Sequence, residues 1–233
     1  MTKYNIKIYK DIKVKMRDGI NLYTDIYLPS DTEYKTINNT PILLERTPYD
    51  KKALNLTERY NYFCSNGYIV VTQDCRGCFA SEGELYFLTQ EAPDGLDTLD
   101  WIGKQDWFEN SNKTVGTFGT SYQAWTQSAA ATQNPKNLNG MIVNMGGSNA
   151  YTSTVRQGGA MELRFIAWAF WHSASNTNNS LKSLETDLAI NSYNFENALN
   201  NWPIKKGLTP LSLIPNYERW AFDILTNTNY DEY

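Results

Sequence analysis

The sequence is poor in the residues that bind metals and form disulfides. It holds one histidine, His172, and three cysteines, Cys64, Cys75 and Cys78. Three thiols are an odd set that cannot make a disulfide framework. A zinc site built on the Cys75–Cys78 pair would have to recruit carboxylates. We therefore expect no metal and no cofactor, and we interpret this pair as two thiols beside a turn.

Charge of one sign and long apolar runs are also missing. The 21 basic and 25 acidic residues give a formal net charge of −4, and no basic block stands out. Nucleic acids and anionic membranes are therefore not expected partners. No stretch approaches the roughly 18 apolar residues of a membrane span, and residues 1–15 lack the apolar core of a signal peptide. The composition predicts a soluble, cytoplasmic protein.

The first part of the chain alternates between strand-like and helix-like segments. Residues 6–16 and 20–28 alternate as half-buried strands around Asp18-Gly19, which predicts an antiparallel hairpin. Apolar runs typical of buried strands lie at 41–44, 68–71, 114–118 and 138–143, and helix-compatible segments lie at 54–64, 93–102 and 122–132. This alternation predicts an α/β fold with a mainly parallel sheet and helices on its faces.

The pattern changes near residue 147. Residues 161–171 form a long helix-compatible segment rich in aromatic residues, and no buried-strand run returns before Tyr233. We therefore expect residues 1–146 to form the sheet domain and residues 147–233 to form a helical cap region.

Ser121 stands between a predicted buried strand and a predicted helix. Such a turn pushes a serine Oγ clear of the sheet, while the next backbone N–H points into the same space at the helix N-terminus. Gly119 provides the small residue that the turn needs, whereas Gln123 departs from the small residue that is usual two positions after the serine. The pattern predicts a nucleophile. A serine that only caps the helix is the alternative that this short motif leaves open.

Two acidic features upstream of this serine are interpreted as structural. Asp74 and Arg76 follow a predicted strand, and we expect them to pair and fix a loop. Asp94, Asp97 and Asp100 recur at helical spacing, and we expect them to form one solvated or capping face.

Five motifs occur in order along the chain. They lie at residues 16–29, 46–51, 73–83, 91–102 and 115–122. Their order and spacing resemble the CocE/NonD hydrolase family, which contains cocaine esterase-like enzymes and X-Pro dipeptidyl-peptidases. The resemblance covers about residues 10–165 and implies an α/β-hydrolase fold, of which this chain is similar to the N-terminal portion only.

The resemblance also implies roles for residues around the serine. In this family the tyrosine of the Pro-Tyr-Asp-Lys motif and the backbone N–H after the nucleophile form the oxyanion hole, and these positions match Tyr49 and Tyr122. Phe165 and Trp168 are candidates for the wall of the substrate pocket. The implied activity is hydrolysis of small esters or amides through an acyl-enzyme on Ser121, with X-Pro dipeptidyl-peptidase activity on peptides as the alternative.

The base that a serine nucleophile needs is not evident. That base is usually a histidine oriented by a carboxylate, and His172 lies in the expected cap, so we interpret it as a cap residue. The resemblance implies an acid and a base on later strands, and no such segments occur here. We therefore expect a truncated sheet with an exposed edge, association through that edge or with a complementing chain, and no activity of the isolated chain. A non-catalytic subunit is the alternative from another class.

Overall fold

The computed structural model describes residues 3–33, 35–162, 164–176, 206–207, 211 and 214–227. It divides into two compact units. Unit 1 comprises residues 1–84 and 90–146, and unit 2 comprises residues 85–89 and 147–233. The sequence did not predict that the short segment 85–89 belongs to the second unit.

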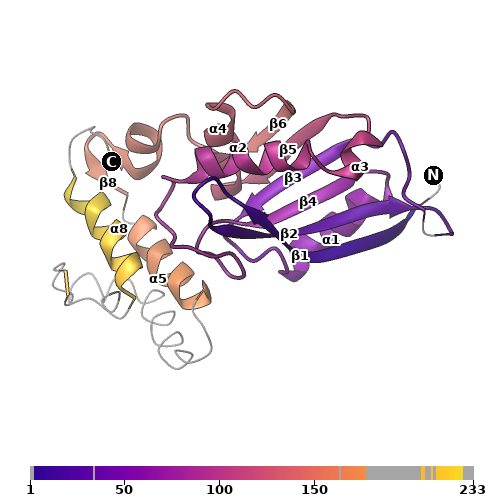
Figure 1. Ribbon diagram of the computed structural model, residues 1–233. Coiled ribbons are helices and arrows are strands. Elements are labelled where there is room, and N and C mark those ends of the chain that lie inside the picture. Colours follow the sequence, from indigo (N-terminus) through magenta and orange to yellow (C-terminus); the bar gives the residue numbers. More distant parts are fainter. Residues whose placement is uncertain are drawn as a thin grey trace. The chain divides into compact units, whose positions relative to one another are not determined.

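Unit 1 is built on a six-stranded sheet with the order β1-β2-β4-β3-β5-β6 (Figure 1). The strands are β1 (Asn5–Lys15), β2 (Asn21–Ser30), β3 (Ile42–Thr47), β4 (Ile69–Asp74), β5 (Val115–Thr120) and β6 (Leu138–Asn144). β1 and β2 form an antiparallel hairpin, and β2 is also antiparallel to β4. The pairs β3–β4, β3–β5 and β5–β6 are parallel. The expected sheet, mainly parallel with an antiparallel N-terminal hairpin, is confirmed.

Helices cover both faces of this sheet (Figure 1). They are α1 (Leu54–Ser65), α2 (Glu91–Ile102), α3 (Asp106–Glu109) and α4 (Tyr122–Ala131). Leu99 of α2 and Ala130 of α4 pack with Val71 on one face. Leu56 of α1 packs with Val70 on the other face. Neighbouring residues of β4 thus enter opposite core layers, which explains why the central strands are continuously apolar.

The prediction that Asp94, Asp97 and Asp100 share a solvated or capping face of α2 is wrong for Asp94. Asp94 is 1% exposed, because its carboxylate accepts two hydrogen bonds from the Arg76 guanidinium, at 2.6 Å and 2.9 Å. The expected pair of Asp74 with Arg76 is not formed, since Asp74 is bound by Lys51 instead. Asp97 lies nearer the surface and pairs with Arg17.

β6 lies at one edge of the sheet. In the part of the chain that the structure describes, β6 pairs with β5 and with no other strand. Met141, Ile142 and Val143 are 43%, 69% and 39% exposed. An edge of this kind presents unpaired backbone groups together with apolar side chains. Association through it stays a prediction.

The described part of unit 2 contains a helical turn, a short hairpin and two helices. Its described elements are a π-helical turn (Tyr151–Val155), β7 (Arg156–Gln157), β8 (Ala160–Met161), α5 (Arg164–Asn176) and α8 (Pro215–Thr226). The helix expected from residue 161 starts only at Arg164, because Gly158 and Gly159 take positive φ angles and fold β7 against β8. Within the described ranges, no helix has the length and apolar character needed to cross a membrane.

Candidate active site

Ser121 occupies the turn between β5 and α4 in a backbone conformation that side-chain-bearing residues avoid. Its φ is 63° and its ψ is −120°, and the residue is exposed. Such a conformation costs on the order of 1–3 kcal/mol and persists only where the surroundings impose it. The Ser121 N–H donates to the Asn144 carbonyl at 3.0 Å, and the Ser121 carbonyl accepts the Ala124 N–H at 2.9 Å. A strained and exposed serine held in this way indicates a functional position.

Gly119 and Gln123 explain how the turn packs. Gly119 has a φ of +147°, and a Cβ there would lie 2.5 Å from the Gln123 Cβ and 3.2 Å from Glu45 Oε1. Any larger residue at position 119 would therefore collide with its neighbours. Gln123 is 4% exposed, and its Nε2 donates to Thr47 Oγ1 at 3.0 Å. The large residue at position 123 is accommodated because its amide reaches the end of β3.

Tyr49 belongs to the loop that follows β3. β3 and β5 are parallel neighbours, so their carboxyl ends lie at the same edge of the sheet. Tyr49 comes two residues after β3 ends, and Ser121 comes directly after β5. The Tyr49 N–H donates to Thr47 Oγ1 at 3.0 Å, and the Tyr49 side chain is partly buried. The fold thus brings the Tyr49 loop and Ser121 to one sheet edge.

Buried Lys51 anchors the loop that carries Tyr49. Lys51 Nζ lies 2.8 Å from Asp11 Oδ1, 3.6 Å from Asp25 Oδ1 and 3.2 Å from Asp74 Oδ2, and the Lys51 N–H donates to Asp74 Oδ1 at 2.8 Å. Burial raises the pKa of Asp74 to about 6. Hydrogen bonds from Lys51 and then Lys52 lower the pKa of Asp11. These contacts fix the backbone two residues after Tyr49.

A second buried network holds the first turn of α4. The Tyr122 hydroxyl donates to Glu91 Oε1 at 2.9 Å, and Glu91 Oε2 lies 2.8 Å from Arg46 Nη1. Arg46 Nε donates to Gln73 Oε1 at 2.8 Å. Tyr122 is the first residue of α4, where backbone N–H groups point out of the helix N-terminus. Anchoring its ring therefore also fixes the direction of that backbone.

Sequence reasoning missed two members of this second network, Glu91 and Arg46. Arg46 is 3% exposed and lies in β3 two residues after the apolar run 42–44, with the buried Glu45 between them. A cation within a strand that is buried on both faces needs a buried anion. The arginine in this buried strand was therefore a sign of a buried ion pair, although it did not identify Glu91 as the partner.

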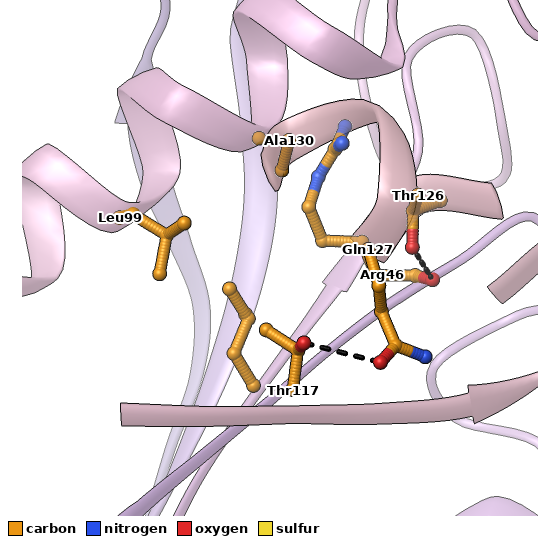
Figure 2. Close-up of a pocket in the computed structure, with 8 residues that line it drawn as sticks. Arg46, Leu99, Thr117, Thr126, Gln127 and Ala130 are labelled. Carbon is orange, nitrogen blue, oxygen red and sulfur yellow. Dashed lines mark hydrogen bonds between the residues drawn. The ribbon is translucent and has the colours of Figure 1, made fainter. Parts of the chain in front are cut away.

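Gln127, one turn after Gln123 in α4, borders a small cavity over β3 and β5 (Figure 2). Its lining residues are Leu44, Arg46, Gly95, Leu99, Thr117, Thr126, Gln127 and Ala130. Thr117 and Gln127 point toward one another, and the Thr117 hydroxyl donates to Gln127 Oε1 at 3.1 Å (Figure 2). The cavity has room for about one water molecule, and neither Ser121 nor Tyr49 lines it. It is a packing void and not a substrate pocket.

The cysteine thiols are inert by position. Cys64, Cys75 and Cys78 are fully buried. Burial raises the pKa of Cys64 to about 12 and raises the pKa values of the other two well above the ordinary thiol range. Within the described ranges, no group of three or more histidine, cysteine, aspartate or glutamate residues is arranged to hold a metal ion.

In unit 2, His172 lies in an aromatic cluster. The cluster comprises Phe87, Phe165, Trp168, His172, Tyr217 and Trp220. The imidazole is fully buried, stacks on Trp168 at 4.4 Å and lies with Nδ1 2.7 Å from the Tyr217 hydroxyl. Phe165 packs against Phe87 at 5.4 Å. A role of Phe165 and Trp168 in a substrate pocket stays a prediction.

Parallel strands that alternate with helices, together with a strained serine at a strand-to-helix turn, define an α/β-hydrolase fold. The model of the X-Pro dipeptidyl-peptidase (S15) family matches residues 18–223, and the chain belongs to this family. The predicted kinship with CocE/NonD hydrolases is thereby confirmed.

Individual relatives agree with this assignment. Cocaine esterase of Rhodococcus sp. (strain MB1 Bresler) is 35% identical over 175 residues, which cover 72% of this chain and 29% of that enzyme. A CocE/NonD family hydrolase of Staphylococcus aureus superposes with a TM-score of 0.61 at 26% identity, covering 78% of this chain and 36% of that one. An α-amino acid ester hydrolase shares the fold, with a TM-score of 0.64 at 23% identity over 98% of this chain and 39% of that one. The chain thus spans well under half the length of these relatives.

Proposed function

We propose that Ser121 is the nucleophile of a serine hydrolase that cleaves ester or amide bonds through an acyl-enzyme. The observation that carries this proposal is the exposed, positive-φ conformation of Ser121 between β5 and α4. Its Oγ attacks the substrate carbonyl carbon and gives up its proton to a base. The tetrahedral intermediate then expels the alcohol or amine, and water hydrolyses the acyl-enzyme.

The oxyanion of that intermediate is held by two donors on different elements. The Tyr49 hydroxyl comes from the loop after β3, and the Tyr122 N–H comes from the start of α4. Loss of one oxyanion donor typically costs about 10²–10³ in kcat. Two buried contacts support this assignment: Asp74 accepts the Lys51 N–H two residues after Tyr49, and the Arg46-bound Glu91 accepts the Tyr122 hydroxyl.

The acid and the base come from polypeptide other than these 233 residues. The only histidine, His172, is packed inside the aromatic cluster of unit 2. The region that matches cocaine esterase covers 29% of that enzyme's length, which leaves ample sequence for further catalytic residues. A complementing segment or chain would bind along β6, whose edge and apolar side chains are exposed. Sedimentation velocity measures such association, and a chain that stays monomeric at all concentrations argues against it.

The expected substrate is a small ester or amide, and the expected location is the cytoplasm. A second candidate is removal of X-Pro dipeptides from peptides, which the description of the matching family favours. That reaction needs an anchor for a free α-amine, and the described residues supply none beside Ser121, so esterase or acylase activity is preferred. If Ser121 proves unreactive in every context, the chain is a non-catalytic subunit instead.

A fluorophosphonate probe tests the nucleophile. We expect mass spectrometry to find the probe on Ser121, with slow labelling of the chain alone and faster labelling when a high concentration of imidazole supplies an exogenous base. Ser121→Ala is the control that removes the label. Absence of label at Ser121 under both conditions contradicts the proposal.

Ester hydrolysis tests whether the chain lacks a base. Hydrolysis of p-nitrophenyl esters by the chain alone, abolished in Ser121→Ala, would show that the chain already contains a base. His172→Ala would then identify that base.

A further inference from the structure

One hydroxyl oxygen joins the loop and the helix that carry the proposed oxyanion donors. Thr47 Oγ1 accepts the Tyr49 N–H at 3.0 Å and the Gln123 Nε2–H at 3.0 Å. Tyr49 carries one donor, and Gln123 directly follows Tyr122, which carries the other. We propose that Gln123 is a positioning residue that sets the separation of the two oxyanion donors through Thr47. This inference rests on the proposed function of Ser121.

The orientation of the Gln123 amide follows from its neighbours. Its Nε2 faces Thr47 Oγ1, and its Oε1 faces the Thr120 N–H at 3.4 Å. The reverse orientation would set an NH2 group against a backbone N–H, which are both donors. The amide therefore contacts the backbone just before Ser121 at one end and the end of β3 at the other. It connects the serine turn to the Tyr49 loop across two strands.

Burial makes these contacts stiff. Gln123 is 4% exposed and Thr47 is 0% exposed, so water does not compete for their hydrogen bonds. Gly119 lies so close to the Gln123 side chain that a Cβ at position 119 would be only 2.5 Å from the Gln123 Cβ. The backbone of Gln123 is held as well, since its carbonyl accepts the Thr126 hydroxyl and the Gln127 Nε2–H, each at 3.0 Å. The amide thus has little freedom to move away from Thr47.

The chemistry explains why such a connection matters. Two donors stabilise an oxyanion only if both converge on one atom, and a displacement of about 1 Å can cost 100-fold in rate. The donors lie on separate elements, so their separation depends on whatever ties those elements together. The Gln123 amide contacts the Thr120 N–H near one donor and the Thr47 hydroxyl near the other, and that hydroxyl accepts the Tyr49 N–H. The residue that departs from the usual small side chain therefore has a specific task in this chain.

The test uses the 233-residue chain with three variants and one matched control. Gln123→Met keeps the length of the side chain and removes its amide, Thr47→Val keeps the shape and removes Oγ1, and Thr47→Ser restores Oγ1. Thr72→Val is the control, because Thr72 is a fully buried threonine on β4 that loses a hydrogen bond of the same length, from its hydroxyl to the Tyr60 hydroxyl at 3.0 Å, and contacts neither donor segment. The readouts are the imidazole-assisted rate of fluorophosphonate labelling at Ser121 and the hydrogen-exchange rate of the Tyr49 amide.

We expect Gln123→Met and Thr47→Val to lower the labelling rate by about 10-fold to 100-fold and to speed exchange of the Tyr49 amide. Thr47→Ser should recover most of the labelling rate. Thr72→Val should leave both readouts unchanged even if it lowers the melting temperature. A merely structural role would make the effects follow the melting temperature in all four variants.

Two outcomes separate the inference from the function on which it rests. If wild-type Ser121 is labelled and Gln123→Met is labelled equally fast with unchanged Tyr49 exchange, the inference is wrong and the proposed function stands. If wild-type Ser121 is never labelled, the proposed function is wrong. The Tyr49 exchange rate in Gln123→Met then still decides whether Gln123 fixes the loop.

Discussion

The contacts inside unit 1 differ in kind from the contacts inside unit 2. Unit 1 buries charged groups, among them Lys51 with Asp25 and Asp74, and Arg46 with Glu91. The described part of unit 2 is centred on stacked and tilted aromatic rings around Trp220 and His172. Buried ion pairs are directional and fix atoms in place, whereas apolar packing tolerates rearrangement.

The difference matters because the candidate catalytic groups lie in unit 1. A buried ion pair is often no more stabilising than a well-packed apolar pair. Its presence below the Tyr49 loop and again beside Tyr122 is therefore best explained by a need for position. In the described part of unit 2, the buried Arg156 donates to the Ile224 and Asn227 carbonyls at the end of α8, and none of the proposed donors lies there.

The largest effect is expected from removing the cation below the Tyr49 loop. Lys51→Met leaves Asp25 and Asp74 buried without their partner, so the free energy of unfolding of unit 1 should fall by about 3–5 kcal/mol. Lys52→Met is the control, because Lys52 also pairs with Asp11 but is 47% exposed and should cost less than about 1 kcal/mol. Hydrogen exchange resolved by peptide measures both. Equal losses in the two variants would contradict the importance of burial.

A smaller loss is expected in unit 2. Trp220 is 1% exposed, stacks on Phe87 at 5.2 Å, and its Nε1 has no hydrogen-bond partner among the described residues. Trp220→Leu should therefore cost packing alone, about 2–3 kcal/mol. Peptides of unit 2 should show the loss in hydrogen exchange. Trp171→Leu is the control, since Trp171 is 48% exposed and its replacement should change little.

The smallest effect concerns pH and sharpens the contrast within unit 1. Because burial raises the pKa of Asp74 from 3.8 to about 6, the folded chain keeps a proton that the unfolded chain has lost between these pH values. This contribution to stability is present below pH 3.8 and is lost as pH rises through about 6. Asp74→Asn removes the titration and keeps an acceptor for the Lys51 N–H.

Urea unfolding across this pH range provides the measurement. The stability of Asp74→Asn relative to wild type should rise by an amount on the order of 2 kcal/mol between about pH 4 and pH 7. A difference that does not change with pH would mean that Asp74 titrates near its ordinary value in the folded chain.

Apolar patterning was enough to predict the sheet and the helices on its faces. The runs at 68–71 and 114–118 correspond to β4 and β5, because residues buried on both faces of a parallel sheet must be continuously apolar. The turn at Ser121 was also predictable, since it lies between two strongly patterned segments. Local periodicity carried all of this information.

The polar contacts could not be predicted in the same way. Proximity in sequence pairs Asp74 with Arg76, two residues away, whereas its partner Lys51 lies across a parallel strand pair. Helical spacing places Asp94 on a solvated face, but Arg76 holds it in the interior. Which charge meets which depends on contacts between distant segments, and one sequence does not contain that information.

The three thiols give the molecule a built-in reporter. All of its cysteines lie in unit 1, and each is buried with a raised pKa. A thiol reagent therefore does not react with the folded protein and reacts only when unit 1 unfolds locally or globally. The rate of that reaction reports the unfolding of unit 1. Unit 2 has no cysteine and does not contribute to the rate.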